Sequence, residues 1–435
     1  MGGLRRLRLF IEEVIRGDGL KGAPVRAVAD FLALAGRGLG LVPRLEPESL
    51  AKAAGVSLDE DPRAREPLVA MCDSMQRDLE VAPRGRMLMG RRLVEILRQR
   101  RLLLDRDEAG ELPEASDSNP PIVVTGFPRS GTTLSHRILA LAEDARTPQW
   151  CELIQPSLES GIKPDRARRR RLARHRTAIR TLDLLAPDLR RIHELIADGP
   201  EECTHLHELA LDSESFGLLG PVQHYRDWID DRDEARRRER YEWQDRCLRA
   251  IVADRRADDP GRRWVLKAPQ HLCQLDDLLE RFPGTLVVRM HRDPVSAMAS
   301  TGSLVACASK IVTRGLPPGL GEDLLEIFME WQDRGDASVA RHPQRILEMH
   351  YDDLVADPVA FVAHVHEAAG IPASGNHLDR VRAHLRHRPR HHFGRHAYSI
   401  ADYGLDENDV RTRLVEYERR VTSIPRITGP VSPPG

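Results

Sequence analysis

The sequence predicts an α/β fold in which helices flank a central parallel sheet, with a helical region at the N-terminal end. Short β-branched runs between residues 121 and 290 alternate with segments of helical apolar periodicity, a pattern typical of a parallel sheet covered on both faces. Residues 1 to about 105 carry apolar residues at three- and four-residue spacing, without strand-like alternation. We therefore expect a helical N-terminal region with a polar linker, residues 1–118, and an α/β domain, residues 119–435, with a helical insertion at about 157–255.

Composition and charge exclude several classes of protein. The 435 residues include 66 basic and 67 acidic side chains, so no overall field draws the molecule to nucleic acid or to an anionic membrane. Six cysteines without a CxxC pair argue against a disulfide framework and a zinc ribbon. No stretch of about 18 uncharged apolar residues is present, and acidic residues interrupt the first apolar segment before a signal-peptide core could form. We expect a cytoplasmic protein without a transmembrane segment.

The first strand, loop and helix form an anion-binding motif. The run PIVVTG (121–126) is followed by FPRSGTT and by an apolar-periodic helix, which gives the G-x4-G outline of a nucleotide-binding P-loop. In proteins that hydrolyse ATP or GTP, lysine and then serine or threonine follow the second glycine. Here Thr132 follows Gly131, the cation is Arg129, and no clear strand ends in a metal-binding aspartate. The loop therefore favours a less charged group than a γ-phosphate, such as a sulfuryl group carried as a phosphosulfate, held without a metal ion.

A second strand–helix unit supplies two further cations. Lys267 ends a strand that begins at Trp264, and the carboxyl end of that strand should lie beside the loop. Arg292 follows the strand 285–290, and Ser300 lies in the first turns of the next helix, so both can face one anion. The alternative is that Arg292 only forms a helix-start ion pair with Asp293.

Two other patterns have simple interpretations. The arginine-rich runs of the insertion are typical of a solvated helix face, although the first run, 166–180, could also bind an acidic polymer. A group of histidines near the C-terminal end matches no zinc pattern with a second pair of ligands, so we expect a basic surface loop and no metal. These histidines are His384, His387, His391, His392 and His396.

Together the motifs resemble those of the sulfotransferases that use 3′-phosphoadenosine-5′-phosphosulfate (PAPS). The resemblance covers roughly residues 120 to 420 and is greatest to a bacterial branch that also resembles tyrosylprotein sulfotransferases. Four segments carry it, in the order and at spacings plausible for the family: PRSGTTL (128–134), LKAPQHL (266–272), FPGTLVVRMHRDPVSAMAS (282–300) and HYDDLVADP (350–358).

The resemblance implies a role for each matching residue. It assigns the 5′-phosphosulfate to Arg129, Ser130, Gly131, Thr132 and Thr133, the 3′-phosphate to Arg292 and Ser300, and a nucleotide contact to Tyr351. The alternative for Tyr351 is a tyrosine packed at a strand end. The sequence departs from the cytosolic small-molecule enzymes, which usually carry lysine in place of Arg129 and a C-terminal RKGxxG segment. Here GRHAYSIADYGLD (394–406) replaces that segment, and Arg395 is the candidate phosphate contact.

Sulfuryl transfer requires cations and a base that takes the proton of the acceptor. Arg129 and Lys267 are the candidate catalytic cations. Glu152 stands near the position of the catalytic glutamate in tyrosylprotein sulfotransferases, whereas His271 has the more suitable ordinary pKa, about 6.5. Glu152 could instead be a helix-start carboxylate, and His271 a partly buried structural imidazole. Further candidates for the base are Glu201, Glu202 and His205.

The sequence thus predicts a sulfotransferase that moves a sulfuryl group from PAPS to a hydroxyl or amine of a small-molecule or lipid-like acceptor. Two alternatives remain: a P-loop kinase or NTPase, and a nucleotide-binding protein that has lost its base. No nucleic acid partner is expected, and no residue pattern identifies the acceptor.

Overall fold

The computed structural model describes residues 22–40, 42–77, 81–114, 119–219, 222–255, 262–316, 319–387 and 399–427. Its centre is a five-stranded parallel sheet with the strand order β2-β3-β1-β4-β5. The strands are β1 (Ile122–Thr125), β2 (Ala145–Arg146), β3 (Arg263–Lys267), β4 (Leu286–His291) and β5 (Ile346–His350). The predicted α/β class and the three expected strands are confirmed; β2 and β5 are additional.

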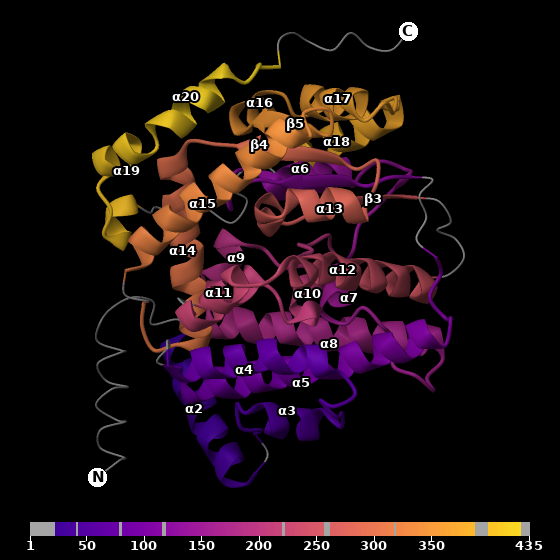
Figure 1. Ribbon diagram of the computed structural model, residues 1–435, viewed down its shortest axis with the longest axis vertical. Coiled ribbons are helices and arrows are strands. Elements are labelled where there is room, and N and C mark those ends of the chain that lie inside the picture. Colours follow the sequence, from indigo (N-terminus) through magenta and orange to yellow (C-terminus); the bar gives the residue numbers. More distant parts are fainter. Residues whose placement is uncertain are drawn as a thin grey trace.

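Helices cover both faces of the sheet (Figure 1). Alternate residues of β1 enter two apolar cores: Ile122 and Val124 face one core, and Val123 faces the other. The first core includes residues of α6 (Thr132–Leu139), α17 (Pro358–Ala368) and α18 (Gly375–His387). The second includes residues of α13 (Leu275–Arg281) and α15 (Leu320–Arg341). This double burial explains why the strands read as β-branched runs without polar alternation.

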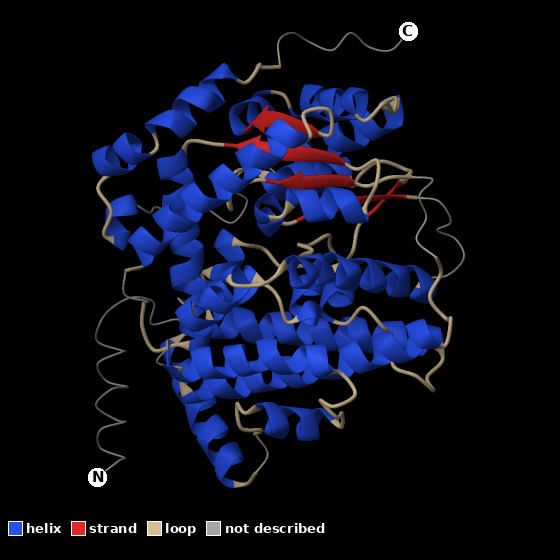
Figure 2. Cartoon of the chain, in the orientation of Figure 1, coloured by secondary structure: helices blue, strands red, loops and turns tan. Residues whose placement is uncertain are grey.

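The N-terminal helices form a layer below the sheet domain (Figure 2). They are α2 (Ala23–Gly38), α3 (Pro47–Ala54), α4 (Pro62–Arg77) and α5 (Pro83–Glu108). The larger apolar core is continuous from this layer, through the insertion, to one face of the sheet. The N-terminal region is therefore packed into the same core as the sheet.

The insertion contains short helices between two long ones, and shorter elements complete the chain. Its elements are α7 (Trp150–Ile154), α8 (Pro164–Leu185), α9 (Leu189–Ile192), α10 (Thr204–His207), η1 (Glu208–Ala210), η2 (Glu214–Leu219), α11 (Gln223–Asp230) and α12 (Glu234–Asp254). The others are η3 (Pro269–Cys273), α14 (Pro294–Val312), α16 (Tyr351–Ala356), η4 (Ile400–Tyr403), α19 (Glu407–Arg413) and α20 (Val415–Ser423).

Helix α14 links the sheet domain to the N-terminal layer. It begins just after β4 and ends against α5, where a Cβ on Gly85 would lie 2.1 Å from the carbonyl oxygen of Val312. Only glycine allows so close an approach of the two backbones. Among the described residues α14 is also the one helix long and apolar enough to cross a membrane, but 72% of its apolar window is buried. This burial is typical of the core helix of a folded domain.

Candidate active site

The loop between β1 and α6 is shaped by two glycines in the left-handed half of backbone space. Gly126 has φ 140°, and a Cβ there would lie 2.4 Å from the Met290 carbonyl oxygen. Gly131 has φ 95°, and a Cβ there would lie 2.7 Å from the Tyr351 ring. Arg129 also has a positive φ, 69°, which is uncommon for a residue with a side chain. The loop thus turns tightly into the N-terminus of α6, the geometry in which successive backbone N–H groups bind an anion.

Three predicted phosphate-binding residues meet at this loop. Arg129 Nε donates a hydrogen bond to Ser300 Oγ at 3.0 Å, and Arg292 Nη1 donates one to the Arg129 carbonyl oxygen at 2.8 Å. The Arg292 guanidinium also lies 4.5 Å from the centre of the Tyr351 ring. Residues that are far apart in the sequence are thereby joined in one positively charged cluster beside the loop.

The alternative ion pair between Arg292 and Asp293 is not what the structure shows. Asp293 caps α14 by accepting a hydrogen bond from the Ser296 backbone N–H at 2.8 Å, and its second oxygen binds Arg411 at 3.0 Å. Asp293 therefore directs its carboxylate to the helix start and to α19.

The Ser130 hydroxyl fits a bound anion. Ser130 is 1% exposed, and its Oγ has no hydrogen-bond partner among the described residues. A buried hydroxyl without a partner is costly, and a phosphosulfate oxygen held in the loop would supply the missing acceptor. This observation supports the loop as an anion-binding site.

A cavity of about 520 Å³ extends from the loop to the insertion. Six residues that the resemblance assigns to the nucleotide or the loop line it: Arg129, Gly131, Thr132, Thr133, Arg292 and Tyr351. The rest of the lining has an apolar part, the apolar wall, formed by Trp150, Leu189, Leu195, Leu304 and Ala308, and a polar part, the polar wall, formed by Glu201, Glu202, Thr204, His205 and Gln270. Ser300, Leu304 and Ala308 succeed one another at four-residue spacing along α14.

Lys267 lies behind the polar wall. It is fully buried, and its ammonium pairs with Glu202 and, at 3.6 Å, with Glu201. Burial alone would raise the pKa of Glu201, but His193, 3.2 Å away, and Lys267 hold it below its usual range. Lys267 thus contacts two cavity-lining carboxylates rather than the cavity itself.

His205 is oriented by a carboxylate and borders the cavity. Its Nδ1 lies 2.8 Å from Glu208 Oε1. Glu208 also accepts hydrogen bonds from Ser215 Oγ at 2.8 Å and from Arg92 Nε, on α5, at 2.6 Å. Burial would raise the pKa of Glu208, but Arg92 and His205 lower it to about 2, so the carboxylate is ionised at neutral pH. An ionised partner at Nδ1 favours the tautomer whose Nε2 accepts a proton.

The structure places Glu152 outside the cavity lining. It is 3% exposed at the start of α7, where its Oε2 accepts a hydrogen bond from the Gln149 backbone N–H at 2.9 Å. Arg255 donates to Glu152 Oε1 at 3.0 Å, and Arg171 lies 3.6 Å away. Glu152 therefore takes the alternative role considered from the sequence, a buried helix-start carboxylate, and its geometry does not support the expectation of a base.

His271 is also outside the cavity lining. It is fully buried in η3, its Nδ1 lies 3.1 Å from the Tyr241 hydroxyl, and its Nε2 has no hydrogen-bond partner among the described residues. Burial, with a smaller contribution from Arg240, lowers the pKa of His271 to about 3. The imidazole is therefore neutral and structural, and it does not fit the expected role as the base.

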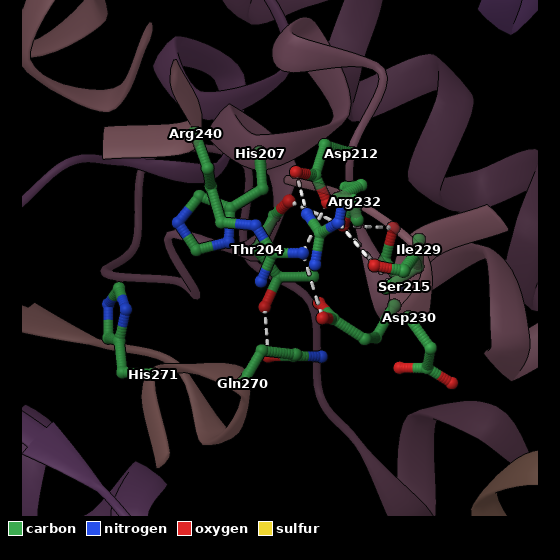
Figure 3. A network of polar contacts seen from close by, with 12 residues as sticks. Thr204, His207, Asp212, Ser215, Ile229, Asp230, Arg232, Arg240, Gln270 and His271 are labelled. Carbon is green, nitrogen blue, oxygen red and sulfur yellow. Dashed lines mark hydrogen bonds and ion pairs between the residues drawn. The ribbon is translucent and has the colours of Figure 1, made fainter. Parts of the chain in front are cut away.

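A buried polar network lies between Thr204 and Gln270 of the cavity lining and the buried His271 (Figure 3). Arg232 and Arg240 both pair with Asp212, and Arg240 also binds Glu214 at 2.8 Å. Nearby, Thr204 Oγ1 donates a hydrogen bond of 2.5 Å to Gln270 Oε1. Neither Thr204 nor Gln270 was predicted to line the cavity. Gln270 lies within the LKAPQHL segment, whereas Thr204 belongs to no motif.

The histidine group gives no metal site within the described part of the chain, where no cluster of three or more histidine, cysteine, aspartate or glutamate side chains could hold an ion. His387 Nδ1 bonds the Ala383 carbonyl oxygen of its own helix at 2.8 Å. His391, His392 and His396, like Arg395, lie outside the described residues.

Comparisons with known proteins agree with this geometry. A family model described as the sulfotransferase family matches residues 120–375. Omega-hydroxy-beta-dihydromenaquinone-9 sulfotransferase Stf3 from Mycobacterium bovis, and the protein of that name from Mycobacterium tuberculosis, are 24% identical over 278 residues, 62% of this chain and 67% of the relative.

Two solved structures share the fold. Sulfotransferase STF1 from Mycobacterium tuberculosis has a TM-score of 0.66 at 25% identity, covering 85% of this chain and 97% of its own. Sulfotransferase STF9 from Mycobacterium avium has a TM-score of 0.67 at 23% identity, covering 88% and 97%. The resemblance predicted from the four sequence motifs is confirmed.

Proposed function

Because the chain belongs to the sulfotransferase family and is a PAPS-dependent enzyme, we propose that it transfers the sulfuryl group to a hydroxyl of a lipid-like acceptor, without a divalent metal ion. The apolar part of the cavity wall carries this proposal. Trp150, Leu189 and Leu304 face the same cavity as the phosphate loop, so an apolar chain bound along them would leave a polar end group near the loop. The name of the related Stf3 protein, a hydroxylated menaquinone sulfotransferase, supports the same class of acceptor.

The residues present fit the co-substrate. The loop N–H groups, the Ser130 hydroxyl and Arg129 would hold the phosphosulfate, and Arg292, Ser300 and Tyr351 would hold the other phosphate. When bound, PAPS supplies the sulfuryl group. The loop amides and Arg129 neutralise negative charge without an ion, which is the basis for expecting no metal.

His205 is the base that the geometry favours. Its Nε2 would accept the proton of the acceptor hydroxyl, and Glu208 would stabilise the imidazolium that forms. Glu202 is the second candidate, because its carboxylate borders the same cavity. It is the less suited of the two, because the Lys267 ammonium already occupies its Oε1. Lys267 is then a positioning residue that fixes Glu202.

The proposal is tested by calorimetry and by an acceptor series. The enzyme should bind 3′-phosphoadenosine-5′-phosphate in the presence of EDTA, while ATP with magnesium serves as the control. Among primary alcohols of increasing length, kcat/KM should rise about threefold to fourfold per added methylene until the apolar wall is filled. A flat series, a preference for short polar acceptors, or activity that disappears with EDTA would contradict the proposal.

A further inference from the structure

A second histidine–carboxylate pair borders the active-site cavity. His193, the residue just after α9, lines the cavity, and its Nε2 lies 3.2 Å from Glu201 Oε2. Its side chain is 17% exposed, close to the 19% of His205, the base proposed above. Proton transfer from the acceptor needs one base, so the reaction as described so far gives His193 no role.

Both oxygens of Glu201 are engaged within the protein. Oε1 accepts a hydrogen bond from the Glu202 backbone N–H at 3.0 Å and lies 3.6 Å from the Lys267 ammonium, while Oε2 faces His193. Although burial alone would raise the pKa of Glu201, His193 and then Lys267 hold it below its usual range, so the carboxylate is ionised. Glu201 is therefore suited to orient the His193 ring rather than to bind the acceptor itself.

This pairing decides which nitrogen of His193 is available to a bound molecule. An ionised carboxylate at Nε2 favours the tautomer that carries its hydrogen there, which leaves a lone pair on Nδ1. Nδ1 has no hydrogen-bond partner among the described residues. Because His193 lines the cavity, Nδ1 is the ring atom that can accept a hydrogen bond from a ligand.

His193 interrupts the apolar wall along the chain. Leu189 precedes it, Leu195 follows it, and all three residues line the cavity. A purely apolar acceptor bound along this wall would cover Nδ1 without giving it a hydrogen bond, and an unpaired polar atom of this kind weakens binding. A chain with a hydroxyl at that point would satisfy Nδ1. The wall therefore favours an acceptor that carries a second hydroxyl.

Main-chain hydrogen bonds hold His193 in a fixed place relative to His205. The His193 backbone N–H donates to the Leu189 carbonyl oxygen at 2.7 Å. Further along the same loop, the Gly199 carbonyl oxygen accepts a hydrogen bond of 3.0 Å from the Trp150 backbone N–H. The Trp150 ring in turn packs against His205, with 4.7 Å between the ring centres. A molecule that reaches both imidazoles must therefore carry its two polar groups at one particular separation.

We propose that His193 selects the acceptor by accepting a hydrogen bond from a second hydroxyl of the lipid-like chain, so that the enzyme prefers an apolar diol to an apolar mono-alcohol. The inference rests on the proposed function, because it concerns the same cavity and the same class of acceptor. His205 takes the proton of the hydroxyl that receives the sulfuryl group, and His193 holds the other hydroxyl. His193 is then a specificity-determining residue and not the base.

A set of dodecanediols tests this preference. Each diol keeps one primary hydroxyl, the second hydroxyl is moved along the chain from one diol to the next, and the primary alcohol dodecanol is the reference. Calorimetry on the enzyme loaded with 3′-phosphoadenosine-5′-phosphate measures affinity without turnover. One diol should bind about threefold to tenfold more tightly than dodecanol, the contribution of a single hydrogen bond. The methyl ether of its second oxygen has no hydrogen to donate and should lose this gain.

Substitutions at His193 separate the hydrogen bond from the shape of the ring. His193→Phe keeps a ring that accepts no hydrogen bond, so the diol should lose its advantage over dodecanol. His193→Gln should retain part of the advantage, because its amide can donate to Glu201 and accept from the diol. His342→Phe is the matched control and should show the wild-type preference. His342 is also paired with a carboxylate, Asp276, at 3.0 Å, but it lies outside the cavity lining.

Four results would overturn the inference. In binding, every diol could match dodecanol, the methyl ether could match the diol, or folded His193→Phe, which still binds the nucleotide, could keep the wild-type preference. In turnover, a loss of about 10²-fold or more in kcat by His193→Phe with diol and dodecanol alike would make His193 the base. The primary-alcohol length series tests the proposed function separately. A flat series with a retained diol preference would refute the apolar acceptor and still support the His193 hydrogen bond.

Discussion

Replacing His205 by glutamine tests the proposed base directly. Glutamine has nearly the size of histidine and can still donate a hydrogen bond to Glu208, but it cannot take up a proton at neutral pH. The change leaves the phosphate loop and the Arg292 cluster untouched, because the hydrogen bonds that join them do not involve His205, which is bonded to Glu208. We therefore expect a selective loss of turnover.

The size of the loss follows from two contributions. Removal of a positioned base costs about 10²- to 10⁴-fold in rate, which is about 2.7 to 5.4 kcal/mol of activation free energy. Glu208 contributes a charged hydrogen bond of 2.8 Å to the imidazolium, worth about 1.5 to 3 kcal/mol. Glu208→Gln should therefore reduce kcat about 10- to 150-fold, less than loss of the imidazole itself. Arg92→Met should have a smaller effect of the same kind, because Arg92 acts through Glu208.

The assay measures kcat with a saturating long-chain alcohol, together with the affinity for 3′-phosphoadenosine-5′-phosphate. His271→Gln is the matched control, since His271 is a histidine that the structure places outside the cavity lining. We expect His205→Gln to lose turnover with unchanged nucleotide affinity, and His271→Gln to lose stability while the folded fraction keeps its turnover.

One outcome would refute the reasoning. If His205→Gln kept turnover within about threefold of the wild type while Glu202→Gln lost 10²-fold or more, Glu202 would be the base. The buried ion pair with Lys267 would then have to open in the substrate complex.

Three further predictions concern the loop, Glu152 and pH. Gly131→Ala should weaken binding of 3′-phosphoadenosine-5′-phosphate at least tenfold in calorimetry. Residue 131 has φ 95°, which disfavours a side chain, and the new Cβ would clash with the Tyr351 ring. Gly375→Ala is the control and should bind normally, because no atom lies within 4 Å of a Cβ there. Glu152→Gln should lower the free energy of unfolding in urea by about 3 kcal/mol and leave turnover of the folded enzyme near the wild type; a catalytic loss without destabilisation would contradict this. His136 and His271 have pKa values of about 3 in the folded protein against about 6.5 when unfolded, so the unfolded chain binds more protons between these values. Each should cost about 2 kcal/mol of stability at pH 5, and urea midpoints that are equal at pH 5 and 7.5 would refute this.

Much of the fold follows from local pattern. The runs that became β1, β3 and β4 are mostly apolar and buried on both faces, so their sequence lacks polar alternation. Strand β2 has only two residues, Ala145 and Arg146, too few for any periodicity. Strand β5, ILEMH, contains a glutamate whose burial depends on Arg289 and Arg420, partners that are distant in the sequence.

The loop was predictable because its chemistry is local, whereas the polar part of the cavity lining was not. Glycines in a G-x4-G outline and the first turn of a helix are adjacent in the chain. Glu208, by contrast, is oriented by Arg92 across 116 residues, and no spacing rule links them. Glu152 did have a local signal, since Gln149 three residues earlier forms a capping box with it. That signal indicates a helix-start carboxylate, whereas the resemblance to tyrosylprotein sulfotransferases indicates a base at the same residue.

Helix α14 joins the two proposed substrate sites at a separation of about one helical turn. Ser300 belongs to the cation cluster, and Leu304, four residues on and about 6 Å along the axis, belongs to the apolar wall. Because α14 is a continuous helix, a displacement of α14 at Ser300 would also displace Leu304. Thermodynamic linkage makes any coupling through this helix reciprocal, so a nucleotide that tightens acceptor binding by some factor would itself be bound more tightly by that same factor in the presence of the acceptor.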